Sequence, residues 1–184
     1  MPKSSFNTLT NSTDDQHLLR PATFWGTAFV AEVLPIFEDN YPGDSRPRHS
    51  LEVAIKYVQG EKRGQDLRRV SLAVFKIGKE VDEPAKYVTK AASALSAVPY
   101  THTDLQTGEQ GWRQARHVLG PVVYAAYALE LSKTSKVVSE DMIDRAIEVA
   151  PNEVRTIIQN FPPQPSKDTR IDYLFKKLDE GLRD

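Results

Sequence analysis

The 184-residue sequence contains no cysteine, which excludes disulfide bridges, thiolate metal ligands and cysteine nucleophiles. It also has no long hydrophobic run. The longest, Val118–Leu131, falls short of the roughly 20 residues that span a bilayer and contains Glu130, so we predict a buried core helix there. Neither charge is in excess, because 24 Lys and Arg stand against 25 Asp and Glu, which argues against a surface built throughout for nucleic acid or anionic lipid.

The motifs of common enzyme classes are missing as well. No GxSxG, HExxH, GxxxxGK[ST] or GxGxxG pattern occurs, so nucleophilic, zinc-peptidase and nucleotide chemistry have no support in the sequence. The first 20 residues contain no apolar stretch that would form the core of a signal peptide. We therefore predict a cytoplasmic protein that is not an enzyme and uses no metal or other cofactor.

The residues that are present favour helices. Trp25, Phe29, Val33 and Phe37 recur every four positions, which aligns them on one helix face. No alternating pattern typical of strands occurs. Hydrophobic residues make up 40% of the chain and charged residues 27%, enough to bury one core. We predict an all-α bundle of about seven or eight helices, with stacked helix pairs as an alternative arrangement.

Caps and breakers divide the chain into segments. We expect the first helix over 22–39 to kink or restart at Pro35, and a second kink or restart at Gly120-Pro121 in the segment 112–133. Asp44 or Ser45, Asp82, Ser139, Asn152 and Asp168 are the predicted starts of later helices. The predicted organisation is a flexible N-terminal segment, 1–20, and one helical domain, 21–184, which comprises a core, 22–136, and a helical C-terminal extension, 137–184.

The segment that follows the first helix is rich in charge. Arg46 and Arg48 lie near a predicted helix N-terminus, where the helix dipole disfavours cations. In one interpretation they pair with nearby carboxylates such as Asp44 or Glu52 and fasten the loop. In the other, they bind an anion or a carboxylate on a partner, and both can hold at once.

Two other features leave alternatives open. His102 and His117 could form a metal site only with help from Asp104, Glu109 or Glu52, so a structural or interface role is favoured over a metal-dependent hydrolase. Residues 61–90 carry eight Lys or Arg against five acids, whereas 137–160 carry two against five. Solvated helix faces are the favoured interpretation of both runs, and a nucleic-acid accessory role for the basic one is an alternative.

Two stretches of sequence point to a family. AEVLPIFEDNYPGDSRPRHSLEVAIKYVQGE and, later, RHVLGPVVYAAYA resemble the immunity proteins of bacterial polymorphic toxin systems, specifically the family numbered fifth in that classification. The likeness spans Phe24–Leu131. It includes an LP-hydrophobic-FE helix end, a P-x-D-x-RPR loop, and a His before a helix rich in Gly and Ala. About ten extra residues appear between His102 and His117, which departs from the family pattern.

The resemblance implies a helical protein that neutralises a toxin by binding and occluding it, without a reaction of its own. The expected partner is a protein, with no role for a membrane. Interfaces depend on a few aromatic and Arg anchors. The candidate binding residues are Tyr41, Asp44, Arg46, Arg48, Glu52, His102, Trp112 and His117.

Overall fold

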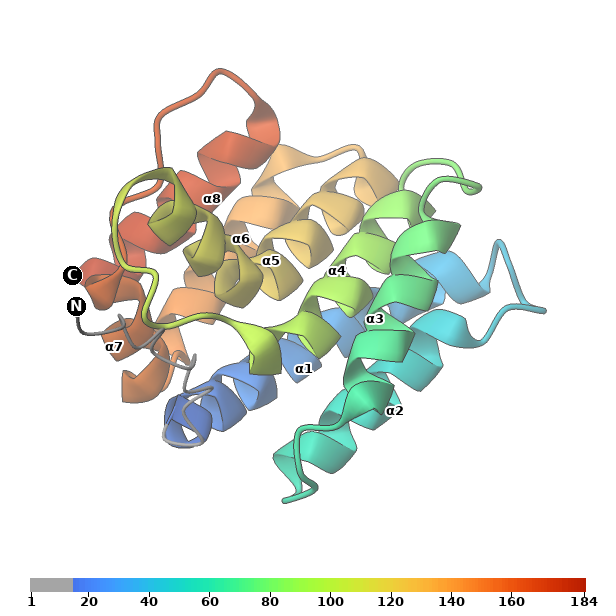
Figure 1. Cartoon of the computed structure of the whole chain (residues 1–184). Helices are drawn as coiled ribbons and strands as arrows, with labels where there is room; N and C mark the ends of the chain where they lie inside the picture. The colour runs from blue at the N-terminus through green and yellow to red at the C-terminus, as the bar shows by residue number, and fades with distance from the viewer. Residues whose placement is uncertain (1–14) are drawn as a thin grey trace, which may run out of the picture.

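The computed structural model describes residues 15–184. Eight α-helices make up this part of the chain, which contains no strand, so the predicted all-α bundle is confirmed (Figure 1). The helices are α1 (Gln16–Glu38), α2 (Arg46–Val58), α3 (Gln65–Ile77), α4 (Ala85–Ala97), α5 (Gly108–Lys133), α6 (Lys136–Glu148), α7 (Asn152–Asn160) and α8 (Arg170–Arg183), with a short 3-10 helix, η2 (Val98–Tyr100), between α4 and α5.

Helix α5 lies at the centre of the molecule. It contacts α1, α4, α6 and α8, and Figure 1 shows α2 and α3 on one side of the α4–α5 pair and α8 on the other. Val118, Leu119 and Val122 are fully buried, as predicted for this apolar run. The small residues Ala125 and Ala126 are buried too, because short side chains let neighbouring helices approach closely. The Gly120-Pro121 pair lies inside the continuous helix α5, so no new helix starts there.

Helix α1 is longer than its sequence pattern predicts. It begins at Gln16, six residues before the expected start, and continues through Pro35 to Glu38. Leu19 is buried, and Arg20 donates a hydrogen bond to the Tyr57 carbonyl, so contacts with other helices extend α1 into the segment that was predicted to be flexible. Of the predicted flexible segment 1–20, residues 1–14 lie outside the described residues. The predicted apolar stripe from Trp25 to Phe37 is buried, as expected.

Several helices start a few residues away from their predicted starts. Ser45 directly precedes α2, but its side chain forms no capping hydrogen bond, and the Arg46 amide donates to Asp44 Oδ1 over 3.1 Å instead. Ser139 lies inside α6 instead of capping it, since Ser135 precedes the helix and Ser139 is fully buried. Helix α8 is capped by Thr169, whose hydroxyl accepts a hydrogen bond from the Asp172 amide, and not by Asp168. Helix α4 likewise begins at Ala85, after Pro84, and α5 begins at Gly108, four residues earlier than predicted.

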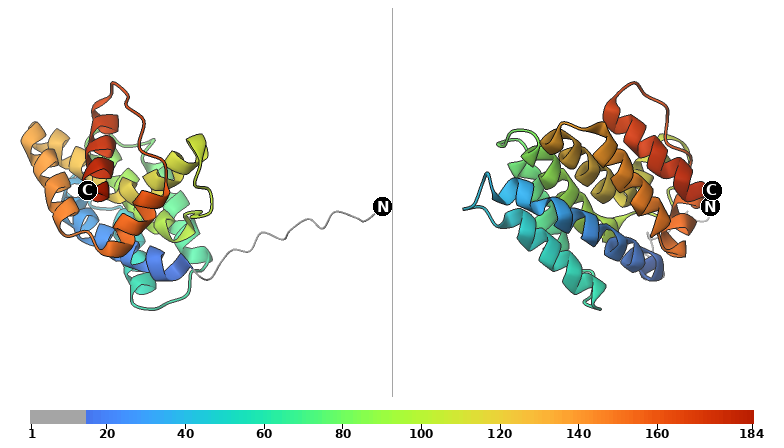
Figure 2. Two further views of the ribbon diagram at one scale, coloured as in Figure 1. Left: turned by 90° about the vertical axis from the view of Figure 1, so that its left-hand side faces the viewer. Right: turned by 180° about the vertical axis from the view of Figure 1, so that it is seen from behind.

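Buried polar contacts join the helices after 137 to the rest of the bundle. Figure 2 shows α1, α6, α7 and α8 together in the view from behind, and Trp25 Nε1 of α1 donates to the Ala146 carbonyl of α6 over 3.0 Å. Arg116 of α5 pairs with Asp172 of α8 at 2.5 Å. Arg170 of α8 pairs with Glu130 of α5 at 2.9 Å. The C-terminal helices are therefore held to α5 by two ion pairs that are largely shielded from water.

Candidate partner-binding surfaces

The loop between α1 and α2 holds both arginines in ion pairs. Arg46 donates to both carboxylate oxygens of Asp44, at 2.8 and 2.6 Å, and Arg48 donates to both of Glu38, at 2.5 and 2.8 Å. The hydrogen bond from Arg48 lowers the pKa of Glu38, and the one from Arg46 lowers the pKa of Asp44. These contacts correspond to the loop-fastening interpretation, and about half of each arginine side chain stays exposed.

Two more candidate residues contact the same region. The Tyr41 hydroxyl donates to Asp82 Oδ1 over 2.6 Å and so links the α1–α2 loop to the segment before α4. This hydrogen bond raises the pKa of Tyr41. Glu52 lies one turn into α2 and faces His49 at 3.6 Å, so it does not pair with either candidate arginine. Each of these polar groups therefore already has a partner within the protein.

A second group of candidates lies around the start of α5. Three cationic groups lie over the Trp112 ring. The guanidinium groups of Arg113 and Arg116 and the ammonium group of Lys167 lie 5.6, 4.9 and 5.0 Å from the ring centre. His117 keeps part of its surface exposed, and desolvation by the surrounding residues lowers its pKa, with a further lowering from the charge of His102. Within residues 15–184, however, no three His, Asp or Glu side chains converge to hold a metal ion.

An apolar groove lies between α3, α4 and α5. It has a volume of about 420 Å³ and is lined by Ser71, Leu72, Phe75, Lys90, Ser93, Ala94, Ala97, His117 and Tyr124. Leu72 and Phe75 form its outer wall, with 57% and 52% of their surface exposed. Large apolar side chains so exposed are typical of interaction sites when they are gathered along a groove.

Only His117 of this groove was among the predicted site residues. The missed signal is in α3, whose buried stripe consists of Leu67, Val70, Val74 and Ile77. Leu72 and Phe75 are large apolar residues that fall off this stripe, so the helical period itself marks them as exposed. Their proximity to Lys90 could not be predicted, because it depends on how α3 packs against α4.

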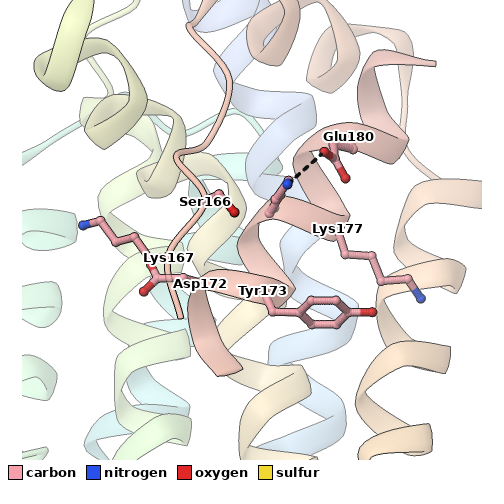
Figure 3. A pocket seen from close by; sticks show the side chains of 7 residues that line it. Ser166, Lys167, Asp172, Tyr173, Lys177 and Glu180 are labelled. Atoms are coloured by element: carbon pink, nitrogen blue, oxygen red, sulfur yellow. Dashed lines mark ion pairs between the residues drawn. The ribbon is translucent and has the colours of Figure 1, made fainter. Parts of the chain in front are cut away.

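A smaller pocket of about 260 Å³ lies beside α8 (Figure 3). Two of its three lysines have carboxylate partners, since Lys176 faces Glu180 at 3.7 Å and Lys177 pairs with Asp144 at 2.6 Å. The third, Lys167, lies over the Trp112 ring. Asp172 at its edge is held by Arg116. The charged groups of this pocket therefore mostly serve contacts within the protein.

The cations of residues 61–90 are mostly engaged with neighbouring groups. Arg63 donates to the Pro99 carbonyl, Arg69 pairs with Asp66 and Lys86 faces Glu83 at 3.9 Å. Arg68 lies over the Tyr100 ring. Lys90, like Arg68, contacts aromatic rings and no carboxylate, but its rings, Tyr87 and Tyr124, come from α4 and α5, and both Lys90 and Tyr124 line the groove.

The fold and these surfaces define an all-helical protein with an open apolar groove. No helix in the described region combines the length and the apolar character needed to cross a membrane. A family model described as "Imm-5 like putative immunity protein" matches residues 10–106, more than half of the chain. The chain belongs to this family of immunity proteins. A search of curated proteins and a search of solved structures each returned no match.

Proposed function

We propose that the protein neutralises a toxin by binding it and covering a surface that the toxin needs, without catalysing a reaction. Membership of the immunity family carries the proposal. The protein would act in the cytoplasm of the cell that makes the toxin, and its partner would be a protein. An open groove with exposed apolar side chains supports recognition of a protein surface better than enclosure of a small molecule, because small-molecule sites cover most of their ligand.

Co-expression tests this function directly. A candidate toxin domain, taken from the genes that neighbour the gene for this chain, is induced in a host cell, alone and together with the protein. We expect growth to stop with the toxin alone and to continue when both are present. The purified pair should form a complex of defined stoichiometry, and the toxin should be recovered unmodified from it, which would separate occlusion from an enzymatic mechanism.

The result that contradicts the proposal is equally concrete. If the toxin domain kills and the protein, produced in soluble form at a similar level, neither restores growth nor binds it, the protein is not its immunity protein. Recovery of a cleaved or modified toxin would instead show a catalytic mechanism.

A further inference from the structure

The groove between α3, α4 and α5 combines an apolar wall with an ammonium group that lacks a carboxylate partner. Lys90 Nζ lies 4.8 Å from the centre of the Tyr87 ring and 5.6 Å from that of Tyr124. Among residues 15–184 it forms no ion pair, although most of the charged residues discussed above do. Aromatic faces attract a cation but leave its positive charge unneutralised.

The surroundings of Lys90 make its charged form less stable, so an anion placed beside Lys90 would stabilise that form. Burial lowers the pKa of Lys90, and the neighbouring charge of Lys86 lowers it further, while Glu83 acts in the opposite direction. Lys79 lies over the Phe75 ring at 5.9 Å, so a further cation stands at the same wall of the groove. A carboxylate placed here would be attracted by Lys90 and Lys79, neither of which forms an ion pair within residues 15–184. Glu83, which faces Lys86 at 3.9 Å, offsets part of this attraction.

The polar groups on the floor of the groove do not compete for such a partner. The Ser71 hydroxyl donates to the Ser93 carbonyl and the Ser93 hydroxyl donates to the Ser71 carbonyl, each over 2.9 Å. Their hydrogen bonds are therefore satisfied between α3 and α4. What the groove offers to an incoming chain is the apolar surface of Leu72 and Phe75 and the charge of Lys90.

We propose that this groove is the toxin-binding site, and that it receives an acidic segment of the toxin in which a large apolar side chain stands close to an Asp or Glu. The apolar side chain lies against Leu72 and Phe75, and the carboxylate pairs with Lys90. An apolar anchor in a pocket, next to a charge pair, is the arrangement that dominates binding in many protein interfaces. The proposal rests on the proposed function, since it names the surface through which immunity acts.

Variants at the groove test the proposal, with the toxin domain that the protein neutralises in the co-expression assay as the probe. Phe75→Ala and Leu72→Ala remove the wall, and Lys90→Glu reverses the charge. Val137→Ala and Val149→Ala are the matched controls for the wall, because these apolar residues are 64% and 62% exposed on another part of the surface. Lys62→Glu is the matched control for the charge, since Lys62 is exposed and lies in the loop before α3, at the end of that helix remote from Phe75.

We expect each groove variant to weaken toxin binding by at least 30-fold in calorimetric titration and to abolish rescue of growth, with the three controls within threefold of the unchanged protein. Lys90→Gln should also flatten the salt dependence of the dissociation constant, because one charge pair is lost. Thermal unfolding of every variant checks that the substitution leaves the fold intact.

Failure of the groove proposal can be told apart from failure of immunity. If the unchanged protein binds and neutralises the toxin, and the groove variants do so equally well, immunity stands and the groove proposal is wrong. If Phe75→Ala instead converts a dimer to a monomer and leaves toxin affinity unchanged, the groove serves a second copy of this chain, which also overturns the proposal.

Discussion

Replacing Arg170 by Met tests how the C-terminal helices are held to the rest of the protein. Arg170 begins α8 and pairs with Glu130 of α5 and with Glu140 of α6, each at 2.9 Å. Burial opposes the charge of Arg170, but the hydrogen bonds to these two carboxylates outweigh it, so its pKa is raised. One guanidinium therefore joins three helices.

The loss of stability expected for Arg170→Met follows from the loss of the ion-pair partner of Glu130. Its side chain is only 10% exposed, and without Arg170 its remaining side-chain partner among the described residues is the Ser139 hydroxyl, at 2.5 Å. Breaking a buried ion pair from one side typically costs about 3–5 kcal/mol, because a charge stays buried without compensation. We expect about 3 kcal/mol for Arg170→Met, since Ser139 still donates and the methionine retains most of the apolar stem.

Urea unfolding followed by circular dichroism measures this loss. With a slope of about 2 kcal/mol per molar urea, the transition midpoint should fall by about 1.5 M. Arg113→Met is the matched control, because Arg113 forms an ion pair with Glu109 in which both side chains are more than 60% exposed, and such pairs contribute about 0–1 kcal/mol. Combining Arg170→Met with Glu130→Gln should cost at least about 1 kcal/mol less than the two separate losses together. A loss from Arg170→Met no larger than that from Arg113→Met, with additive double-mutant energies, would refute the reasoning.

Three further changes test other parts of the structure. Gly26→Ala places a methyl group 2.9 Å from Leu95 Cδ1 in the core, and such overpacking costs about 1–3 kcal/mol, more than alanine gains in helix propensity. The melting temperature should therefore drop by several degrees. Gly43→Ala is the control, because the space around Gly43 is open, and it should leave the melting temperature nearly unchanged. Desolvation and the charge of His102 lower the pKa of His117, so at this group the native state binds fewer protons than the unfolded chain. The contribution of His117 to the free energy of unfolding should therefore fall as the pH drops below about 6.5. His102→Gln should raise the pKa of His117 in an NMR titration, and an unchanged pKa would show that the two histidines do not interact. A fragment ending at residue 106 lacks half of the buried core residues and should show no cooperative thermal transition, and a sharp one would contradict the central role of α5.

Much of the helix pattern could be predicted from the sequence because it depends on local spacing. The stripe from Trp25 to Phe37 and the apolar run after Val118 each bury the face that their period indicates. The errors lie at helix ends, where distant contacts decide. Leu19 extends α1 because the bundle buries it, and Ser139 is inside α6 because Glu130 of α5 accepts its hydrogen bond. Neither contact leaves a signal in the neighbouring residues.

The candidate site was harder to predict, since charged residues in a loop do not reveal whether their partners are internal. Arg46 and Arg48 attracted attention because cations are unfavourable at a helix N-terminus, and the structure gives each of them a carboxylate in the same chain. Lys90 gave no such signal, because a lysine on a helix face is usually solvated. What distinguishes it is the pair of tyrosine rings from α4 and α5, and that pairing exists only after the helices pack.

The groove also shows why the matched part of the chain is not sufficient for the proposed binding site. The family model covers α3 and α4, which supply Leu72, Phe75 and Lys90, but it ends at residue 106, before α5 begins. His117 and Tyr124, from the unmatched part, complete the groove. Helix α8 is joined to α5 by the ion pairs of Arg116 and Arg170. If toxin binding depends on the groove, Arg170→Met should therefore weaken toxin binding less than Lys90→Glu does, because Arg170 does not line the groove and acts on it only through α5.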